Sequence, residues 1–396
     1  MRNVEAAGLG IGPDHPPRIM GVLNVSSESP YDPSVYDDPG EAAAYVDEEL
    51  IGEGADIVDV GLESANKDLD VLSAEGELAR LDTAVETLES TTGDAVWSIE
   101  TRYHEVADEA LSRGFDMVND ICGFADPEMP RVCQEHDAAV SKMASPPDLE
   151  RPGAIEDVDE IYEALAMNGF TDKTIVDPAF GGWSAAKTHA DDRETFHRLR
   201  EFAGYGRPIL VSINRKSFLK TIADRSTEEA LPVSLAATAM AVERGANVIR
   251  THDVAETRDA ALIGDTFAGS TTHRDGTVTV RELDVRTPRE ARRHLNRLEA
   301  TTDIAAAAAV TTYELTGLSS AAVAALESAT QPTGATFARG ESEAGASGRS
   351  DGQASRSGSR GLLIGTAAEL GAVVEAAAGA SDALDEAIQA IDTHRE

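Results

Sequence analysis

Two adjacent cations, Arg215 and Lys216, follow the apolar run at 208–213, which has the composition of a buried strand. Lysine and arginine are rarely buried unless they are paired, so packing alone does not account for two of them where a strand leaves the core. In α/β folds, the carboxyl ends of parallel strands hold the catalytic and binding groups. The alternative is a solvated basic turn, and the choice depends on how the other strands end.

Polar side chains also follow the other apolar runs. An amide oxygen can bind Mg²⁺ and share it with phosphate groups, and an arginine fork matches a phosphate. A carboxylate accepts two parallel N–H bonds, while an amide offers one donor and one acceptor. Structural alternatives remain open. Asn24 can close an Asx turn, Asp177 can cap a helix, and His252 can be a histidine at the strand ends whose hydrogen bonds are made within the protein. The candidate residues are Asn24, Glu100, Asn119, Asp177, Lys216, Arg250 and His252.

These residues are carried by apolar strands that alternate with amphipathic helices, a pattern that predicts a parallel sheet. Eight strand–helix units fit into about 250 residues, which favours a closed (β/α)8 TIM-type barrel over an open sheet. We expect an N-terminal segment at 1–17, the barrel at 18–268 and a small α+β C-terminal domain at 269–396. A Gly/Ser-rich tract at 340–360 is expected to be a disordered loop.

The composition is strongly acidic, with 71 acidic and 34 basic residues and a net charge of −37. Such a chain repels itself unless salt screens the charge, so a high-salt cytoplasm is the expected location. The charge argues against nucleic acid or an anionic membrane as partner, and no apolar stretch is long enough to span a bilayer. The two cysteines, Cys122 and Cys133, are expected to be buried thiols in a reducing cytosol.

Residues 18–267 resemble the dihydropteroate synthase family, whose fold is a pterin-binding barrel. The resemblance rests on IMGVLNVS at 19–26, NDI at 119–121, VDP at 176–178, RKSF at 215–218 and RTHDV at 250–254. These motifs stand in the family's order and spacing. The acidic composition is similar to that of haloarchaeal members of the family.

The resemblance implies a role for each candidate residue. Asn24 would bind Mg²⁺ and the diphosphate of the pterin substrate, and Arg250 and His252 would hold the same diphosphate as it leaves. The pterin ring would be bound by Glu100, Asn119 and Asp177. Lys216 would contact the pterin and the edge of the 4-aminobenzoate site. Arg215 is expected to be structural, paired with an acidic neighbour.

Several positions depart from the family. Ala65 and Asn66 stand where the family has a Thr-Arg pair that helps to bind the second substrate; Lys67 could substitute, one residue late. Glu100 stands where the family has Asp, so its carboxylate reaches about one methylene further. Ser141 and Lys142 replace the usual Met-His of the fifth strand, and the loop after Asp177 is longer than the family's.

The resemblance therefore implies a transferase of folate biosynthesis. It would join hydroxymethyl-dihydropterin diphosphate to 4-aminobenzoate and release pyrophosphate, with Mg²⁺ as cofactor and small molecules as partners. A homodimer is the expected assembly. The altered second-substrate loops leave two alternatives open. One is a paralogue that uses another amine or acts as a methyltransferase-type pterin domain; the other is a non-catalytic binding protein.

Overall fold

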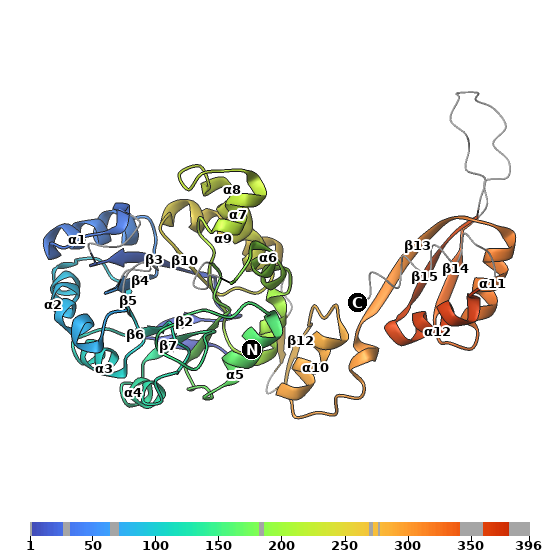
Figure 1. Ribbon diagram of the computed structural model, residues 1–396, viewed down its shortest axis with the longest axis horizontal. Helices are drawn as coiled ribbons and strands as arrows, with labels where there is room; N and C mark the ends of the chain where they lie inside the picture. Colours follow the sequence, from blue (N-terminus) through green and yellow to red (C-terminus); the bar gives the residue numbers. More distant parts are fainter. Residues whose placement is uncertain are drawn as a thin grey trace, which may run out of the picture. The chain divides into compact units, whose positions relative to one another are not determined.

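The computed structural model describes residues 2–26, 32–63, 71–181, 186–268, 272–275, 278–340 and 359–379. The chain divides into two compact units, Met1–Ser270 and Thr271–Glu396 (Figure 1). Each unit has a hydrophobic core of its own.

The first unit is built on a parallel sheet of eight strands in the order β8-β7-β6-β5-β4-β3-β10-β9. A parallel bridge between Val176 and Ile209 joins the two outer strands, and the Val176 N–H donates to the Pro208 carbonyl at 2.9 Å. The sheet therefore closes into the predicted (β/α)8 barrel. Its strands are β3 (Arg18–Asn24), β4 (Ile57–Gly61), β5 (Val96–Thr101), β6 (Met117–Asp120), β7 (Ala139–Met143), β8 (Thr174–Asp177), β9 (Leu210–Ser212) and β10 (Val248–Thr251).

Helices follow the strands and surround the barrel (Figure 1). Their apolar sides pack against the outer face of the strands in one large core, as the amphipathic patterns predicted. They are α1 (Pro39–Tyr45), the π-helical turn η2 (Val46–Ile51), α2 (Ala74–Ser90), α3 (His104–Ser112), α4 (Met129–Glu135), α5 (Val158–Ala166), α6 (His189–His197), the 3₁₀ segment η3 (Leu199–Tyr205), α7 (Ser217–Ala223), α8 (Leu231–Glu243) and α9 (Val254–Ala268); a 3₁₀ turn, η1 (Asp32–Ser34), precedes α1.

An N-terminal hairpin closes the bottom of the barrel, a feature that the sequence did not predict. Strands β1 (Val4–Ala6) and β2 (Leu9–Ile11) pair antiparallel, and Ala7 and Gly8 between them both have positive φ, as a two-residue type I′ turn requires. The hairpin buries Val4, Ala6 and Ile11 against one apolar residue from each barrel strand. Those eight residues are Met20, Ile57, Val96, Met117, Ala139, Ile175, Leu210 and Val248.

The second unit contains a three-stranded antiparallel sheet in the order β13-β15-β14. Helices α11 and α12 pack on one face of this sheet, where Leu326 and Leu370 join Leu363 of the central strand in a small core. Strand β13 was not predicted, because the stretch 305–330 is rich in Ala and Thr and indicates one helix. The elements are β11 (Thr272–Asp275), β12 (Val278–Arg281), α10 (Pro288–Arg297), η4 (Ala305–Ala308), β13 (Val310–Leu318), α11 (Ser320–Thr330), β14 (Thr336–Arg339), β15 (Ser359–Thr366) and α12 (Ala367–Ala377). Most of the predicted Gly/Ser loop, 341–358, lies outside the described residues.

Candidate functional site

The carboxyl ends of the barrel strands bring five of the predicted residues to one small cavity. It has a volume of about 30 Å³ and is lined by Glu100, Asn119, Asp177, Lys216 and Arg250. These five side chains come from β5, β6, β8, the start of α7 and β10. The parallel barrel assembles them because all its strands point the same way and end on one rim.

A buried carboxylate that the sequence analysis missed lies at the centre of this group. Asp59 of β4 is fully buried and accepts hydrogen bonds from Arg250 Nε at 2.7 Å, Asn119 Nδ2 at 3.0 Å and Ser98 Oγ at 2.7 Å. The second arm of the arginine fork, Arg250 Nη2, donates to Glu100 Oε2 at 2.6 Å. Arg250, which is predicted to bind the diphosphate, is therefore paired with two carboxylates.

A local signal for Asp59 was present in the sequence. Side chains alternate between the two faces of a strand, and Asp59 lies two residues after Ile57, which faces the barrel interior. Ser98 and Ser141 stand at the equivalent step of β5 and β7, two residues after Val96 and Ala139. Barrel interiors are normally filled by large aliphatic side chains. Asp59, Ser98 and Ser141 therefore form a polar layer inside the barrel, below the strand ends.

Burial sets the protonation behaviour of the cavity. It raises the pKa of Asp177 to about 6, opposed by the Ala179 N–H that its carboxylate accepts at 2.8 Å and by the charge of Lys216. Burial also raises the pKa of Glu100, against the lowering effect of Arg250. For Arg250, burial acts to lower the pKa, but the carboxylates of Glu100 and Asp59 hold it above its usual value. Arg250 is therefore a permanent cation.

Lys216 and His252 are less basic than usual. Burial, and then the charge of Arg250, lowers the pKa of Lys216 to about 8 and that of His252 to about 3. His252 is therefore a neutral imidazole near neutral pH and can offer a diphosphate an N–H donor. Lys216 passes over Gly181, where an added Cβ would lie 3.0 Å from the lysine Nζ, so the glycine leaves room for the side chain.

Arg215 holds the two loops that carry Lys216 and His252. Its Nε and Nη2 donate to the two oxygens of Asp253, both at 2.8 Å, and its Nη1 donates to the Thr227 carbonyl at 2.6 Å. The predicted acidic partner is thus Asp253. Arg215 also has a φ of 52°, an uncommon conformation for a residue other than glycine, and these bonds stabilise it.

The residues around Asn24 fit the predicted magnesium site. The Asn24 amide donates from Nδ2 to Ser34 Oγ at 3.0 Å, which leaves Oδ1 as the ligand atom. Gly61 faces this oxygen, and a Cβ at that position would lie 2.9 Å from Asn24 Oδ1 and 3.9 Å from Glu100 Oε1. A side chain at position 61 would crowd the Asn24 oxygen, so glycine is needed there, and oxygen is the type of ligand that Mg²⁺ prefers.

Lys142, one of the two residues that stand in place of the family's Met-His, points away from the cavity. Strand β7 runs to Met143, so Lys142 lies within the strand and faces the helices. Its Nζ donates to the carbonyls of Met167 and of Gly169, the latter at 2.9 Å, and lies 4.6 Å from the centre of the Phe124 ring. The lysine therefore caps the carboxyl end of α5.

Ser141 points into the barrel beside Asn119, its partner in the register of β6 and β7. Its Oγ is buried, and within the described parts of the chain it has no hydrogen-bond partner. The other altered positions, Ala65 and Asn66, lie outside the described residues together with Lys67.

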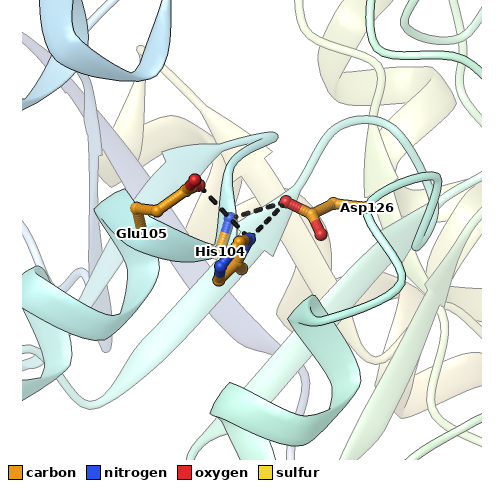
Figure 2. A group of neighbouring side chains, drawn as sticks. All are labelled: His104, Glu105 and Asp126. Carbon is orange, nitrogen blue, oxygen red and sulfur yellow. Dashed lines mark hydrogen bonds and ion pairs between the residues drawn. The ribbon is translucent and has the colours of Figure 1, made fainter.

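A second polar group stands on the outer rim of the barrel: His104, Glu105 and Asp126 (Figure 2). His104 Nδ1 lies 2.8 Å from Asp126 Oδ2 and 3.2 Å from Glu105 Oε2. Asp126 Oδ2 also accepts the His104 backbone N–H at 3.0 Å, and its Oδ1 accepts the Glu128 N–H at 3.1 Å. These bonds explain the group structurally, because Asp126 caps the N-terminus of α3.

A hollow of about 250 Å³ lies at the opposite end of the barrel, beside Cys133, Asp137 and Lys173. Barrels of this class place their chemistry at the carboxyl ends of the strands, so we assign no function to this hollow. Cys122 and Cys133 are free and buried, as predicted. None of the helices in the described part of the chain is long and apolar enough to cross a membrane.

Comparison with known proteins matches the profile of the pterin binding enzyme family to residues 20–252. The chain belongs to this family. It is 30% identical over 253 residues to dihydropteroate synthase of Bacillus subtilis, covering 62% of this chain and 87% of that protein. It is 34% identical over 259 residues to a probable bifunctional folylpolyglutamate synthase/dihydropteroate synthase of Halobacterium salinarum, covering 62% of this chain and 31% of that longer protein.

Solved structures of the same family share the barrel. Dihydropteroate synthase of Coxiella burnetii, in complex with pteroic acid, is 28% identical with a TM-score of 0.57, and the match covers 68% of this chain and 99% of that one. The enzyme of Thermus thermophilus in complex with 4-aminobenzoate is 27% identical with a TM-score of 0.54, covering 67% and 100%. The predicted family and the barrel are confirmed. The extension beyond the barrel lies outside the matched family region.

Proposed function

We propose that this chain is a dihydropteroate synthase, a transferase that joins hydroxymethyl-dihydropterin diphosphate to 4-aminobenzoate and releases pyrophosphate. The observation that carries the proposal is the convergence of Glu100, Asn119, Asp177, Lys216 and Arg250 on one cavity in a chain of the pterin-binding family. Two solved family members bind pteroic acid and 4-aminobenzoate, which supports these compounds as ligands of a related barrel.

The residues divide the work between the two ends of the pterin substrate. The carboxylates of Asp177 and Glu100 accept N–H bonds from the edge of the ring, and the Asn119 amide supplies a mixed donor and acceptor. Arg250 and His252 hold the diphosphate and stabilise its charge as the carbon–oxygen bond breaks. The aminobenzoate nitrogen attacks the methylene carbon, so the enzyme needs no nucleophile of its own.

We propose Mg²⁺ as the cofactor, bound through Asn24 Oδ1 and oxygens of the diphosphate. When bound, the ion neutralises charge on the leaving group. Magnesium usually takes few protein ligands and completes its shell with phosphates and waters, so the amide oxygen of Asn24 is a sufficient protein contribution. Titrating pyrophosphate into the protein with and without MgCl₂ tests this assignment: Asn24→Ala should remove the effect of MgCl₂ on the affinity.

The test of the activity is a pyrophosphate-release assay at about 2 M KCl, where the acidic surface is screened. Release from the pterin diphosphate should depend on 4-aminobenzoate and yield dihydropteroate by mass spectrometry. Asp177→Asn is the inactive control, and Asp172→Asn, an exposed substitution at the opposite end of the barrel, is the matched active one. No product from the parent protein would refute the proposal.

The second candidate is a pterin transferase that uses a different amine. It is favoured by Ala65 and Asn66, which replace the Thr-Arg pair of the second-substrate loop. Offering a panel of aryl and alkyl amines in the same assay separates the two candidates. A second amine that gives a kcat/KM above that of 4-aminobenzoate would favour this alternative.

We also propose that the enzyme is a halophilic, cytoplasmic homodimer. The net charge of −37 supports the first part, and two free thiols suit a reducing compartment. Two neighbouring helices, α8 and α9, expose Met240, Leu262, Ile263 and Phe267, the last with 77% of its surface accessible. An apolar face of this kind can meet its copy across a two-fold axis. Light scattering in high salt should give twice the chain mass, and Phe267→Asp should give a monomer.

A further inference from the structure

The guanidinium of Arg250 is held inside the cavity by the two carboxylates nearest to it. Arg250 Nε bonds Asp59 at 2.7 Å and Nη2 bonds Glu100 at 2.6 Å, with side-chain exposures of 17% for Arg250, 0% for Asp59 and 11% for Glu100. The remaining space is about 30 Å³, whereas pockets for small molecules are usually about 300 Å³ or more. A ring of pterin size therefore enters only when side chains that line the cavity move, and Glu100 and Arg250 are both among them.

The bond between Glu100 and Arg250 depends on the length of the glutamate. Strands β5 and β10 are not neighbours, since β4 and β3 lie between them in the sheet, so the glutamate must reach across the barrel to Arg250. An aspartate would be shorter by one carbon–carbon bond, about 1.5 Å, and would leave the two groups beyond hydrogen-bond distance. This pair is therefore specific to a chain that has Glu at position 100.

Both groups have a second task under the proposed function, on which the following inference rests. Glu100 accepts N–H bonds from the pterin ring, and Arg250 binds the diphosphate. The oxygen Oε2 of Glu100 and the Nη2 of Arg250 are now occupied by each other. A pterin that takes Glu100 releases Arg250, and a diphosphate that takes Arg250 releases Glu100.

We propose that Glu100 and Arg250 form an intramolecular latch that couples the pterin subsite to the diphosphate subsite, so that each ligand promotes binding of the other. Asp59 keeps its own bond to Arg250 Nε and holds the guanidinium near the cavity while the latch is open. Once pyrophosphate has left, Arg250 returns to Glu100 and competes with the pterin edge of the product, which speeds product release.

The coupling is reciprocal, since pyrophosphate must raise pterin affinity by the same factor as pterin raises pyrophosphate affinity. Coupling between sites is typically about 5- to 150-fold. We expect roughly tenfold here, because one charge-assisted hydrogen bond is exchanged on each side of the latch.

Calorimetry on the full-length protein in high salt tests the proposal, with 6-hydroxymethylpterin as a probe that lacks the diphosphate. Its dissociation constant is measured with and without saturating pyrophosphate at constant MgCl₂. In the parent, pyrophosphate should tighten pterin binding by roughly tenfold. In Glu100→Asp, the pterin alone should bind more tightly than to the parent, and pyrophosphate should add less than about twofold. A residue that only contacted the pterin would shift in the opposite direction when shortened.

Glu201→Asp is the matched control, because Glu201 bonds Arg198 Nε at 2.9 Å in a buried pair outside the cavity; it should keep the full coupling. Glu100→Gln, which keeps the length but removes the charge, should also lose the coupling and serves if the aspartate variant does not fold. Equal pterin affinity with and without pyrophosphate in the parent, or full coupling in both Glu100 variants, overturns the latch while leaving the proposed function intact. Failure of the parent to bind the pterin at all overturns both.

Discussion

Replacing Asp177 by Asn changes one oxygen of the cavity into an N–H donor and keeps the shape of the side chain. Asp177 is 4% exposed, and its Oδ1 accepts the Ala179 N–H at 2.8 Å. The amide of the variant can keep this bond through its own oxygen, so we expect the fold to survive. The group presented to the pterin becomes a donor that faces another donor.

The cost follows from this change. Losing a charge-assisted hydrogen bond removes about 1.5–3 kcal/mol, and a buried donor left without an acceptor adds to this loss. We therefore expect a loss of about 2–4 kcal/mol in pterin binding, which corresponds to a dissociation constant roughly 30- to 1000-fold higher. The affinity for pyrophosphate should change little, because Arg250 and His252 are untouched.

The pH dependence provides a second readout. Burial raises the pKa of Asp177 to about 6, so the carboxylate is charged above this pH and protonated below it. Between about pH 6 and pH 7, where Asp177 is charged and Lys216, with a pKa of about 8, is still protonated, the parent should bind the pterin with nearly constant affinity. Below pH 6 it should lose about tenfold per pH unit. The Asn variant cannot titrate at this position and should lack this step. Calorimetry across pH 5–8 measures both proteins.

Two results would refute this reasoning. If Asp177→Asn binds the pterin as tightly as the parent near pH 7.5, where the parent carboxylate is charged, Asp177 does not accept a bond from the ring. If both proteins lose affinity equally below pH 6, another group is titrating. Circular dichroism in the aromatic region distinguishes either result from a loss of the fold.

Four further outcomes are expected. Ile11→Ala should lower the free energy of unfolding by about 2–5 kcal/mol, because this hairpin residue is fully buried; Leu9→Ala, which alters a half-buried neighbour, should cost clearly less in the same urea titration. Arg215→Lys breaks the two-armed bond to Asp253 and should reduce stability by about 1.5–3 kcal/mol; a loss below about 0.5 kcal/mol would contradict the role of that pair. The melting temperature should fall on dialysis from molar salt to about 0.1 M, since −37 charges become unscreened. Deleting 271–396 should leave pterin affinity unchanged, because all the cavity residues belong to the first compact unit.

The sequence by itself predicted the barrel and five of the residues that line its rim cavity, because both are encoded locally. Apolar strands, helix periodicity and glycine stops are visible within windows of a few residues. Asn119 and Asp177 could be identified as rim residues because each stands at the end of such a window. Because the strands of such a barrel are parallel, all their carboxyl ends lie at the same rim, so the sequence pattern is enough to place these residues there.

Only the tertiary structure decided which of these groups contact each other. The bond between Arg250 and Asp59 joins residues 191 positions apart, and nothing local indicates that pair or the closed cavity that results. The side to which Lys142 points was also decided there. Strand β7 extends to Met143 and so includes Lys142, and successive side chains of a strand point to opposite faces. Pairing across the barrel depends on closure and register, which are properties of the whole sheet and not of any one of its strands.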